Sequence, residues 1–298
     1  MPKNKPSLIS IAKQLNGSNF KKFKFIIRGL LHQEDLQNLF TLLQKNSLAQ
    51  IIKAQPDIYN KPFREYLYCN NTTKNKFNFI QSHYTYISKI FNTNNMKMLY
   101  SLPGLELLKF ELEDIGTLRV NLCYIPDLGK EGEITLLLSI NDADLYSIQF
   151  SFNQDNELNL VIAGIQSRGT VDNDLIKKVT KKMHGLRPRN FLIFIIRQIC
   201  EILDVKLILA IRSKYHIANC SHVSKTDKFQ ANYDQYWDEE LGIKGEIFYT
   251  LPLKESRKAI EDIASKKRSQ YRKRYAMLDE FKEIIKQNLL DFTLRGSS

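Results

Sequence analysis

The sequence lacks the features that mark secreted and membrane-spanning proteins. Its longest purely apolar run, residues 191–196, ends at Arg197, whereas a membrane span needs about 20 apolar residues. The first residues lack the apolar stretch of a secretory signal peptide. Four cysteines, at positions 69, 123, 200 and 220, are too few and too scattered for a disulfide framework or a CxxC metal site. We therefore expect a cytoplasmic protein that is at most peripheral to a membrane.

Several catalytic and structural signatures are also missing. There is no internal repeat of 20 to 50 residues, no phosphate-binding Walker loop and no nucleophile elbow. His216 and His222 have no carboxylate at regular spacing and only Cys220 near them, so we expect no metal site.

Positive charge is what the chain has in excess. The 298 residues are 43% hydrophobic, enough for a sizeable core, and carry a net charge of +12. Residues 168–197 hold eight Lys or Arg and two acids, and residues 254–275 hold nine and three. Each segment therefore has a charge of +6, and the rest of the chain balances. We expect a site for an anionic, phosphate-bearing ligand where the two segments meet.

Hydrophobic periodicity predicts an α+β protein in two parts, an N-terminal helical accessory region (1–115) and an α+β domain (116–298). In the first part, helices are predicted at 34–53, 59–66 and 77–91. In the second, the pattern predicts an antiparallel meander of four strands at 118–124, 134–140, 146–152 and 158–163. Helices at 172–183 and 190–203 then lead to a strand at 206–211, which makes a βαβ crossover. A helix at 233–241, a strand at 247–251 and a long basic helix at 257–290 follow.

Three segments are candidate anion sites. The predicted loop 164–170 offers small residues and one cation, although a plain turn explains the same pattern; its candidates are Gln166, Ser167, Arg168, Gly169 and Thr170. The start of the helix at 190–203 combines free N–H groups with arginines that could instead anchor the loop to acidic residues; its candidates are Gly185, Arg187, Arg189 and Asn190. The third is the basic run Lys266, Lys267 and Arg268, which is by default a solvated helix face.

Acid–base chemistry has three candidate residues, namely His184, His216 and Asp234. A histidine titrates near neutral pH and is a natural general base, and Asp234 shares a helix face with Asp238. Each of the three alone is more often structural.

Three stretches resemble the hallmark motifs of the VirK/YbjX family of Gram-negative bacteria, and the likeness covers residues 61–290. They are Thr180-Lys-Lys-Met-His-Gly-Leu-Arg-Pro-Arg189, Tyr233-Asp-Gln-Tyr-Trp-Asp-Glu239 and Ser265-Lys-Lys-Arg-Ser-Gln-Tyr-Arg-Lys-Arg-Tyr275. The resemblance implies a bacterial cytoplasmic protein, some members being linked to virulence, envelope integrity and resistance to antimicrobial peptides. It supplies no reaction.

The element order also resembles the GNAT acyltransferase superfamily, and Gln166-Ser-Arg-Gly-Thr-Val171 is similar to its Q/R-x-x-G-x-G/A cofactor loop. This chain departs from that pattern at Val171 and by the inserted helix at 172–183. The resemblance implies a GNAT-like mixed sheet, with coenzyme A pyrophosphate at 167–170 or 185–190. One of the three acid–base candidates would then be the base.

We therefore expect an acyltransferase, or a protein that binds acyl-CoA or an acyl-carrier protein thioester. The first alternative is a non-catalytic basic adaptor that meets the anionic inner membrane surface, or an envelope partner, through Lys266 to Arg274. The second is nucleic-acid binding, which is favoured by charge alone. The sequence leaves the oligomeric state open.

Overall fold

A computed structural model describes residues 7–168, 172–220 and 232–293. The chain begins with a helical region of seven elements, and four of its helices start at a Ser, Thr or Asn side chain that accepts a backbone N–H. The elements are α1 (Leu8–Gln14), α2 (Asn19–Leu31), α3 (Gln33–Leu43), α4 (Asn46–Ala54), the 3-10 helix η1 (Pro56–Phe63), α5 (Thr73–Ile90) and α6 (Thr93–Leu99).

The single helix expected at 34–53 is wrong, because this stretch forms two helices, α3 and α4. The backbone at Lys45 is extended, with φ −73° and ψ 130°, and this breaks the helix. The turn lets α4 pack against α6 instead of continuing along α3. Apolar residues on both sides of the break keep a helical period, so periodicity alone does not reveal it.

An eight-stranded sheet forms the centre of the molecule, in the order β1-β2-β3-β4-β5-β6-β8-β7. Neighbours are antiparallel except β5 and β6, which are parallel. The strands are β1 (Leu105–Leu112), β2 (Gly116–Cys123), β3 (Ile134–Ile140), β4 (Ala143–Gln154), β5 (Leu158–Ser167), β6 (Leu207–Ile211), β7 (Ile243–Lys244) and β8 (Phe248–Leu251). A short 3-10 helix, η2 (Pro126–Leu128), lies between β2 and β3.

The antiparallel part of the sheet has one strand more than the expected four. Strand β1 lies within the region assigned to the helical part, and it pairs with β2 along its length. A register shift between Glu106 and Leu108 interrupts the alternation of side chains. Leu107 and Leu108 are therefore both buried, and the period-two signal that marks a strand is lost.

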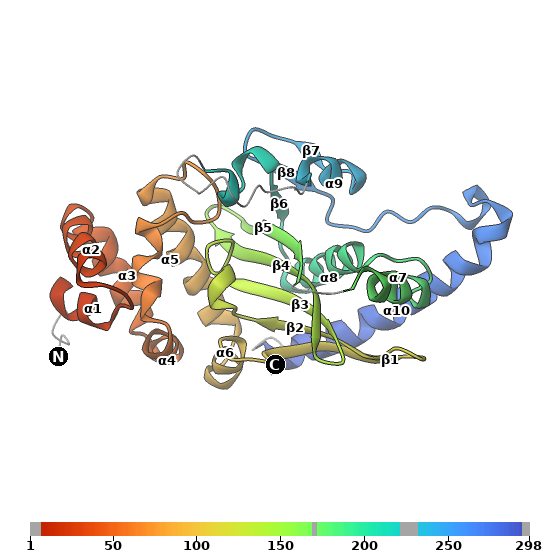
Figure 1. Cartoon of the computed structure of the whole chain (residues 1–298), viewed down its shortest axis with the longest axis horizontal. Coiled ribbons are helices and arrows are strands. Elements are labelled where there is room, and N and C mark those ends of the chain that lie inside the picture. Colours follow the sequence, from red (N-terminus) through yellow and green to blue (C-terminus); the bar gives the residue numbers. More distant parts are fainter. Residues whose placement is uncertain (1–6, 169–171, 221–231, 294–298) are drawn as a thin grey trace.

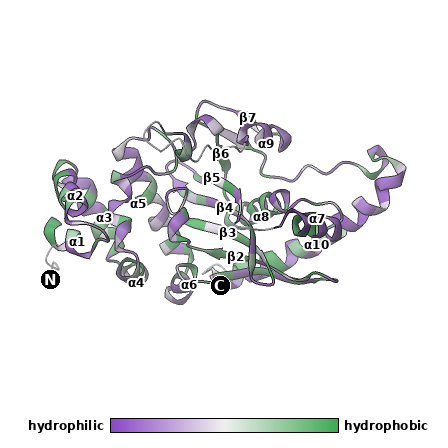
Figure 2. Ribbon diagram, in the orientation of Figure 1, coloured by the Kyte–Doolittle hydropathy of each residue, from purple (hydrophilic) through white to green (hydrophobic). Residues whose placement is uncertain are grey.

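Helices cover both faces of the sheet (Figure 1). The βαβ crossover between β5 and β6 is confirmed; it contains α7 (Asn173–Lys182) and α8 (Pro188–Leu203). Helix α8 is buried along most of its length and packs on β3, β4 and β5, as its apolar sequence predicts. Helix α5 packs on β4 through His83, whose Nδ1 accepts the Phe152 N–H at 3.1 Å. Hydrophobic residues are concentrated in the strands and α8 (Figure 2).

The last part of the chain returns to the sheet and ends in a long helix. It comprises the 3-10 helices η3 (Ser213–Tyr215) and η4 (Ile217–Asn219), then α9 (Tyr233–Glu239), η5 (Ile260–Asp262) and α10 (Ser265–Phe292). The expected start of the final helix at residue 257 is wrong, since α10 begins at Ser265 and the residues before it run largely extended. The second half of α10 packs on α8 and β1, whereas its first turns project from the body (Figure 1).

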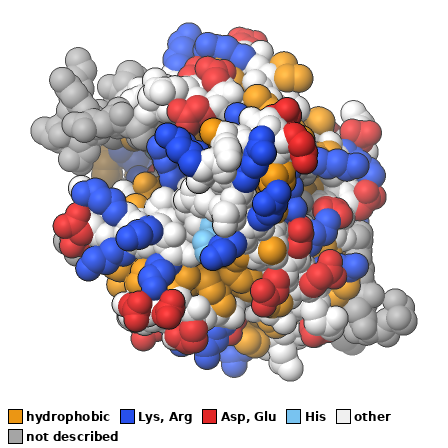
Figure 3. All heavy atoms as spheres, turned by 90° about the vertical axis from the view of Figure 1, so that its right-hand side faces the viewer, with side chains coloured by type: hydrophobic (Ala, Val, Ile, Leu, Met, Phe, Trp, Pro, Cys, Tyr) orange, Lys and Arg blue, Asp and Glu red, His pale blue; other side chains and the backbone are white. Residues whose placement is uncertain are grey.

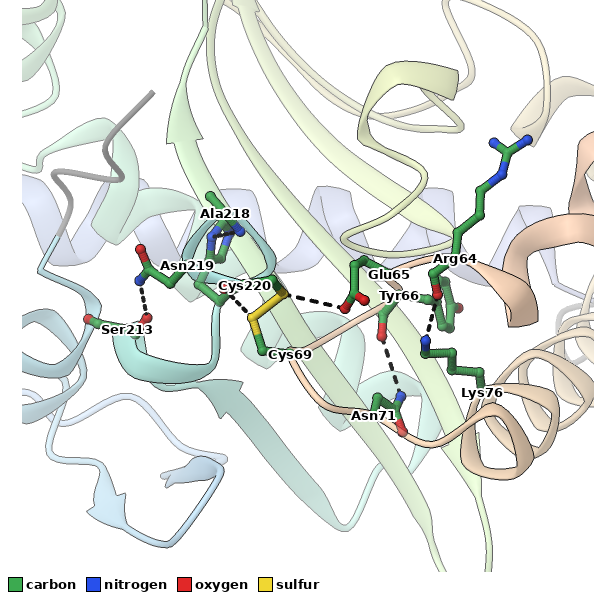
Figure 4. Close-up of a disulfide and its surroundings, with 11 residues drawn as sticks. Arg64, Glu65, Tyr66, Cys69, Asn71, Lys76, Ser213, Ala218, Asn219 and Cys220 are labelled. Atoms are coloured by element: carbon green, nitrogen blue, oxygen red, sulfur yellow. Dashed lines mark hydrogen bonds between the residues drawn. A yellow bond between two sulfur atoms is a disulfide. The ribbon is translucent and has the colours of Figure 1, made fainter. Parts of the chain in front are cut away.

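One disulfide joins two distant parts of the chain (Figure 4). Cys69 follows η1 and Cys220 follows η4, 151 residues later, and their Cα atoms are 5.4 Å apart. The sequence does not reveal this pair, because neither cysteine belongs to a spaced motif. Cys123 and Cys200 are free and buried. No helix in the described part of the chain has both the length and the apolar character needed to span a membrane.

Candidate functional site

A cavity of about 620 Å³, which we call the basic cavity, lies where α7, the start of α8 and α10 come together beside β4. Of the residues that the structure describes, four cations and no acid line it. The lining residues are Tyr146, Ile176, Lys177, Thr180, Lys181, Arg187, Pro188, Arg189 and Gln270. A ligand with several negative charges would fit such a lining.

The two basic segments of the sequence meet beside this cavity. Arg274 on α10 donates from Nε and Nη2 to the backbone carbonyl of His184, at 3.0 and 2.7 Å. Gly185, the next residue after His184, has a φ of +77°. A Cβ at this position would be 2.8 Å from both Arg274 Nη2 and Gln270 Nε2. The turn between α7 and α8 thus needs glycine both for its backbone conformation and for the close approach of α10. Figure 3 shows Lys and Arg side chains, with acids between them, over this end of the molecule.

The four cations of the cavity differ in how they are neutralised. Lys177 pairs with Asp174 at 2.9 Å, and Arg189 pairs with Glu239 at 2.9 Å while its guanidinium lies over the Tyr236 ring. Lys181 and Arg187 make no ion pair with any described residue, and both are exposed. Arg187 is the N-cap of α8 and its side chain makes no capping bond. Arg187 therefore lies without an ion-pair partner among the described residues at the positive end of the α8 dipole, and Lys181, in the last turn of α7, adds a second such cation to the cavity.

The second group of predicted residues, Gly185, Arg187, Arg189 and Asn190, lies at or beside this cavity. Arg187 and Arg189 line it. Asn190 donates from Nδ2 to Glu240 Oε1 at 2.6 Å, which ties the first turn of α8 to the end of α9.

The predicted loop 164–170 is mostly strand, which corrects that expectation. β5 continues to Ser167 because Gln166 and Ser167 pair with Ser147 and Tyr146 of β4. The Gln166 side chain does not line the basic cavity but donates to Gln149 of β4 and to Glu131 in the loop before β3. Arg168 lies 3.8 Å from Asp144. Gly169 and Thr170 lie outside the described residues.

Lys266, Lys267 and Arg268 are brought together in the first turn of α10 but do not line the cavity. Arg268 donates to the carbonyls of Ile263 and Glu261 at 2.9 and 3.0 Å, so it holds the chain that enters the helix. Of this helix, Gln270 reaches the cavity.

The three predicted acid–base residues lie in different places. His184 lies in the turn between α7 and α8, where partial burial and the nearby Lys273 and Arg274 lower its pKa. Asp234 on α9 accepts the Ser213 N–H at 2.7 Å and faces Arg212 at 3.3 Å. Burial opposes its ionisation, but these contacts outweigh burial and lower its pKa. Asp234 thus anchors the turn after β6.

His216 is buried and lies beside an acid that sequence reasoning missed. Its Nδ1 accepts the Ala218 N–H at 3.2 Å, and its Nε2 is 3.7 Å from Oε1 of Glu131. Burial lowers the pKa of His216 to about 4. The Glu131 carboxylate lies against Gly164 of β5, where a Cβ would collide with it, and it accepts from Gln166 Nε2 at 3.2 Å.

Burial also raises the pKa of the Glu131 carboxyl to about 7, although Arg168 and Lys130 oppose the shift. Such a carboxyl changes protonation near neutral pH, as a general base does. The sequence signal was present, because Lys130-Glu-Gly-Glu133 places two acids directly before the buried strand β3.

Glu131 opens into a second cavity of about 790 Å³, which we call the mixed cavity, between the helical region and the sheet. Four cations and three acids line it together with three apolar residues. They are Arg28, Phe63, Arg64, Glu65, Lys76, Asp127, Lys130, Glu131, Ile217 and Ala218. This mixed lining contrasts with the purely cationic charge of the basic cavity.

Comparison with known proteins places the chain in a family. The model of the family described as "Protein of unknown function (DUF535)" matches residues 16–287. The chain belongs to the DUF535 family. It is 28% identical to "Uncharacterized protein YbjX" of Escherichia coli (strain K12), over 86% of this chain and 79% of that one. It is 36% identical to an "Uncharacterized protein" of Haemophilus influenzae, over 52% of this chain and 58% of that one. No solved structure matches.

The expected VirK/YbjX resemblance is thereby confirmed. The structure also shows where the three motif stretches of this DUF535 chain lie. The first forms the end of α7, the turn and the start of α8, and the third begins α10. The second forms α9, which supplies Glu239 to Arg189. All three stretches therefore converge around the basic cavity.

Proposed function

We propose that this DUF535 protein binds an acyl thioester carried on coenzyme A or an acyl-carrier protein, and transfers the acyl group to an acceptor. The observation that carries the proposal is the basic cavity, where Arg187 at the start of α8 and Lys181 at the end of α7 lie unpaired among the described residues. Both carriers bear phosphate next to a pantetheine arm, and phosphate is the group that such a helix start favours.

The strand order supports the GNAT resemblance that element order suggested. An antiparallel meander leads into one parallel pair, β5 and β6, bridged by the crossover helix α8. The two strands pair only from Asn159 and Leu207 to Ile162 and Ala210, so β5 continues to Ser167 without β6 beside it. This leaves an opening beside the end of β5. We place the pantetheine arm of the thioester donor, called the donor arm below, in this opening.

Tyr233 from α9 fills part of that opening. Its hydroxyl accepts the Ile165 N–H at 2.8 Å and donates to the Ile165 carbonyl at 2.7 Å. A donor arm that extends along β5 would take over these two backbone groups, so α9 would have to shift when the thioester binds. We therefore propose that Tyr233 occupies the place of the arm when no thioester is bound.

Transfer would use Glu131, which lies between this opening and the mixed cavity. Its carboxylate would take the proton from an amine or hydroxyl of the acceptor, which would then attack the thioester carbonyl. The C–S bond would break as the new amide or ester forms, and the departing thiolate would take the proton that Glu131 holds. His216, which lies beside Glu131, would orient that carboxylate. The cations of the mixed cavity favour an acceptor that itself carries an anionic group.

A thermal-shift experiment tests the donor site. Coenzyme A, acetyl-CoA and a long-chain acyl-CoA are compared with inorganic polyphosphate. A thioester at 100 times its dissociation constant adds about 2.7 kcal/mol of stability. We expect K181A/R187A to lose most of that gain, and K286A, an exposed lysine farther along α10, to keep it.

Two results would overturn this donor assignment. The first is equal stabilisation by polyphosphate and thioester, which would show a surface that recognises charge only. The second is a gain that survives in K181A/R187A, which would place thioester binding elsewhere.

A further inference from the structure

Helix α2 is apolar on two opposite faces. Phe25 and Gly29 are buried against the rest of the helical region, with Leu8 and Leu36 next to Gly29. On the other side the helix bears five large apolar residues that are 45% to 77% exposed: Phe20, Phe23, Ile27, Leu30 and Leu31. Their spacing of three, four, three and one places them in one stripe about 100° wide. Packing among the described residues explains the first face but not the second.

The charges around this stripe are of one sign. Residues 7–33 contain five Lys or Arg and no Asp or Glu, and the first acid of the chain is Glu34. Lys21, Lys24 and Arg28 lie along one edge of the stripe at helical spacing, and Lys24 Nζ is 4.3 Å from the centre of the Phe20 ring. Figure 1 shows α1 and α2 at one end of the molecule, opposite the projecting start of α10.

We infer that α2 docks this protein on an anionic lipid bilayer, lying in the plane of the interface with the stripe among the acyl chains. Aromatic and branched apolar residues on one face, with cations beside them, are the features of interfacial helices. Negative headgroups complement a segment that has no acid of its own. The inference stands independently of the acyl-transfer proposal, because neither the stripe nor the two lysines beside it line either cavity.

A membrane at this face would lie close to the mixed cavity. Arg28 belongs to α2 and also lines that cavity, where its Nη1 donates to the Phe63 carbonyl at 2.7 Å. The cavity would therefore be held near the bilayer surface.

Sedimentation of the full chain with lipid vesicles tests the inference. We expect binding to vesicles that contain about one third phosphatidylglycerol in phosphatidylcholine, weakening as salt is raised, and little binding to phosphatidylcholine alone. Equal binding to both vesicles, or to neither, would overturn the inference.

Variants of the stripe and of its flank separate the apolar contribution to vesicle binding from the electrostatic one. F23S/I27S should weaken vesicle binding by about tenfold or more per side chain, since each buries a large apolar group in the bilayer. K21Q/K24Q should weaken it about fivefold per lysine and flatten the salt dependence. I243S removes an apolar residue that is exposed elsewhere, on β7, and should bind like the wild type.

The same variants exclude the competing explanations. All of these side chains are exposed, so the melting temperature of each variant should stay near that of the wild type, which shows that the fold is intact. The stripe would instead be a contact between copies of this chain if F23S/I27S dissociated a dimer in analytical ultracentrifugation and left vesicle binding unchanged. Vesicle binding that is lost equally in I243S would likewise overturn the inference.

Discussion

At the scale of single residues, Glu131 gives the molecule a distinctive pH dependence. Its carboxyl accepts a hydrogen bond from Gln166 and lies largely buried beside His216, and this burial raises its pKa to about 7. An unfolded chain would ionise this acid near its ordinary pKa of 4.5. Between these two pH values the folded protein binds the extra proton, so the stability that Glu131 contributes is fully present below about pH 4.5 and is lost as the pH rises to about 7.

We predict that E131Q removes this loss of folding stability with rising pH. The free energy of unfolding of the wild type should fall, relative to E131Q, by about 3 kcal/mol between pH 4.5 and pH 7. Urea denaturation at pH values on either side of this window measures it, and D127N, which changes an exposed acid of the same loop, serves as the control. If the free energies of unfolding of wild type and E131Q differed by the same amount at every pH, the raised pKa assigned to Glu131 would be contradicted.

At the scale of elements, one buried ion pair fastens the helical region to the sheet. Lys61 of η1 lies 2.6 Å from Glu133, just before β3, and Tyr84 of α5 donates to the same carboxylate oxygen at 2.8 Å. Burial disfavours both charges, but each partner outweighs it, so the pKa of Lys61 is raised and that of Glu133 is lowered. The pair is therefore charged inside the protein.

Removal of one partner should cost more than removal of both. We predict that K61M and E133Q each lower the free energy of unfolding by about 3–5 kcal/mol, because each leaves a buried charge or its partners unsatisfied. The double variant K61M/E133Q should lose clearly less than the two single losses combined. A double-mutant cycle by urea denaturation measures this coupling, and strict additivity would contradict it.

The elements that could be predicted from sequence are those whose pattern is local. Strand β3 has the predicted bounds, and α8 was found because its residues are apolar on nearly every side. Strand β1 was missed because its bulge hides the alternation, and the break between α3 and α4 falls where apolar residues continue on both sides.

The residues of the candidate site, too, could be predicted only where a local pattern marks them. The charge counts along the chain led to the prediction that the two basic segments meet. They do meet, since Arg274 contacts the turn at His184. Glu131 and His216 meet only through packing between parts of the chain 85 residues apart, which no local pattern encodes. The division of the chain at residue 115 stays a prediction, since the buried residues of the helical region and the sheet form one continuous cluster.

At the scale of the whole molecule, the Cys69–Cys220 disulfide ties the helical region to the loop after β6 (Figure 4). Glu65 and Ala218, a few residues before each cysteine, both line the mixed cavity. A crosslink over 151 residues restricts the unfolded chain strongly and typically contributes about 2–4 kcal/mol. The redox state should thus change both global stability and the geometry of this cavity.

We predict that a reductant such as dithiothreitol lowers the melting temperature of the wild type and has no effect on C69S/C220S, which should already melt at the lower temperature. C200A is the control: it removes a buried free cysteine, so it should lower stability somewhat yet keep the full response to reductant. Mass measurement after thiol labelling of the unfolded protein should show two free cysteines before reduction and four after it. Four free cysteines in the oxidised wild type, or an equal reductant effect on C69S/C220S, would contradict the crosslink. A response confined to the variants that retain both Cys69 and Cys220 can come only from the bond between them, since Cys123 and Cys200 are the same in wild type and C69S/C220S.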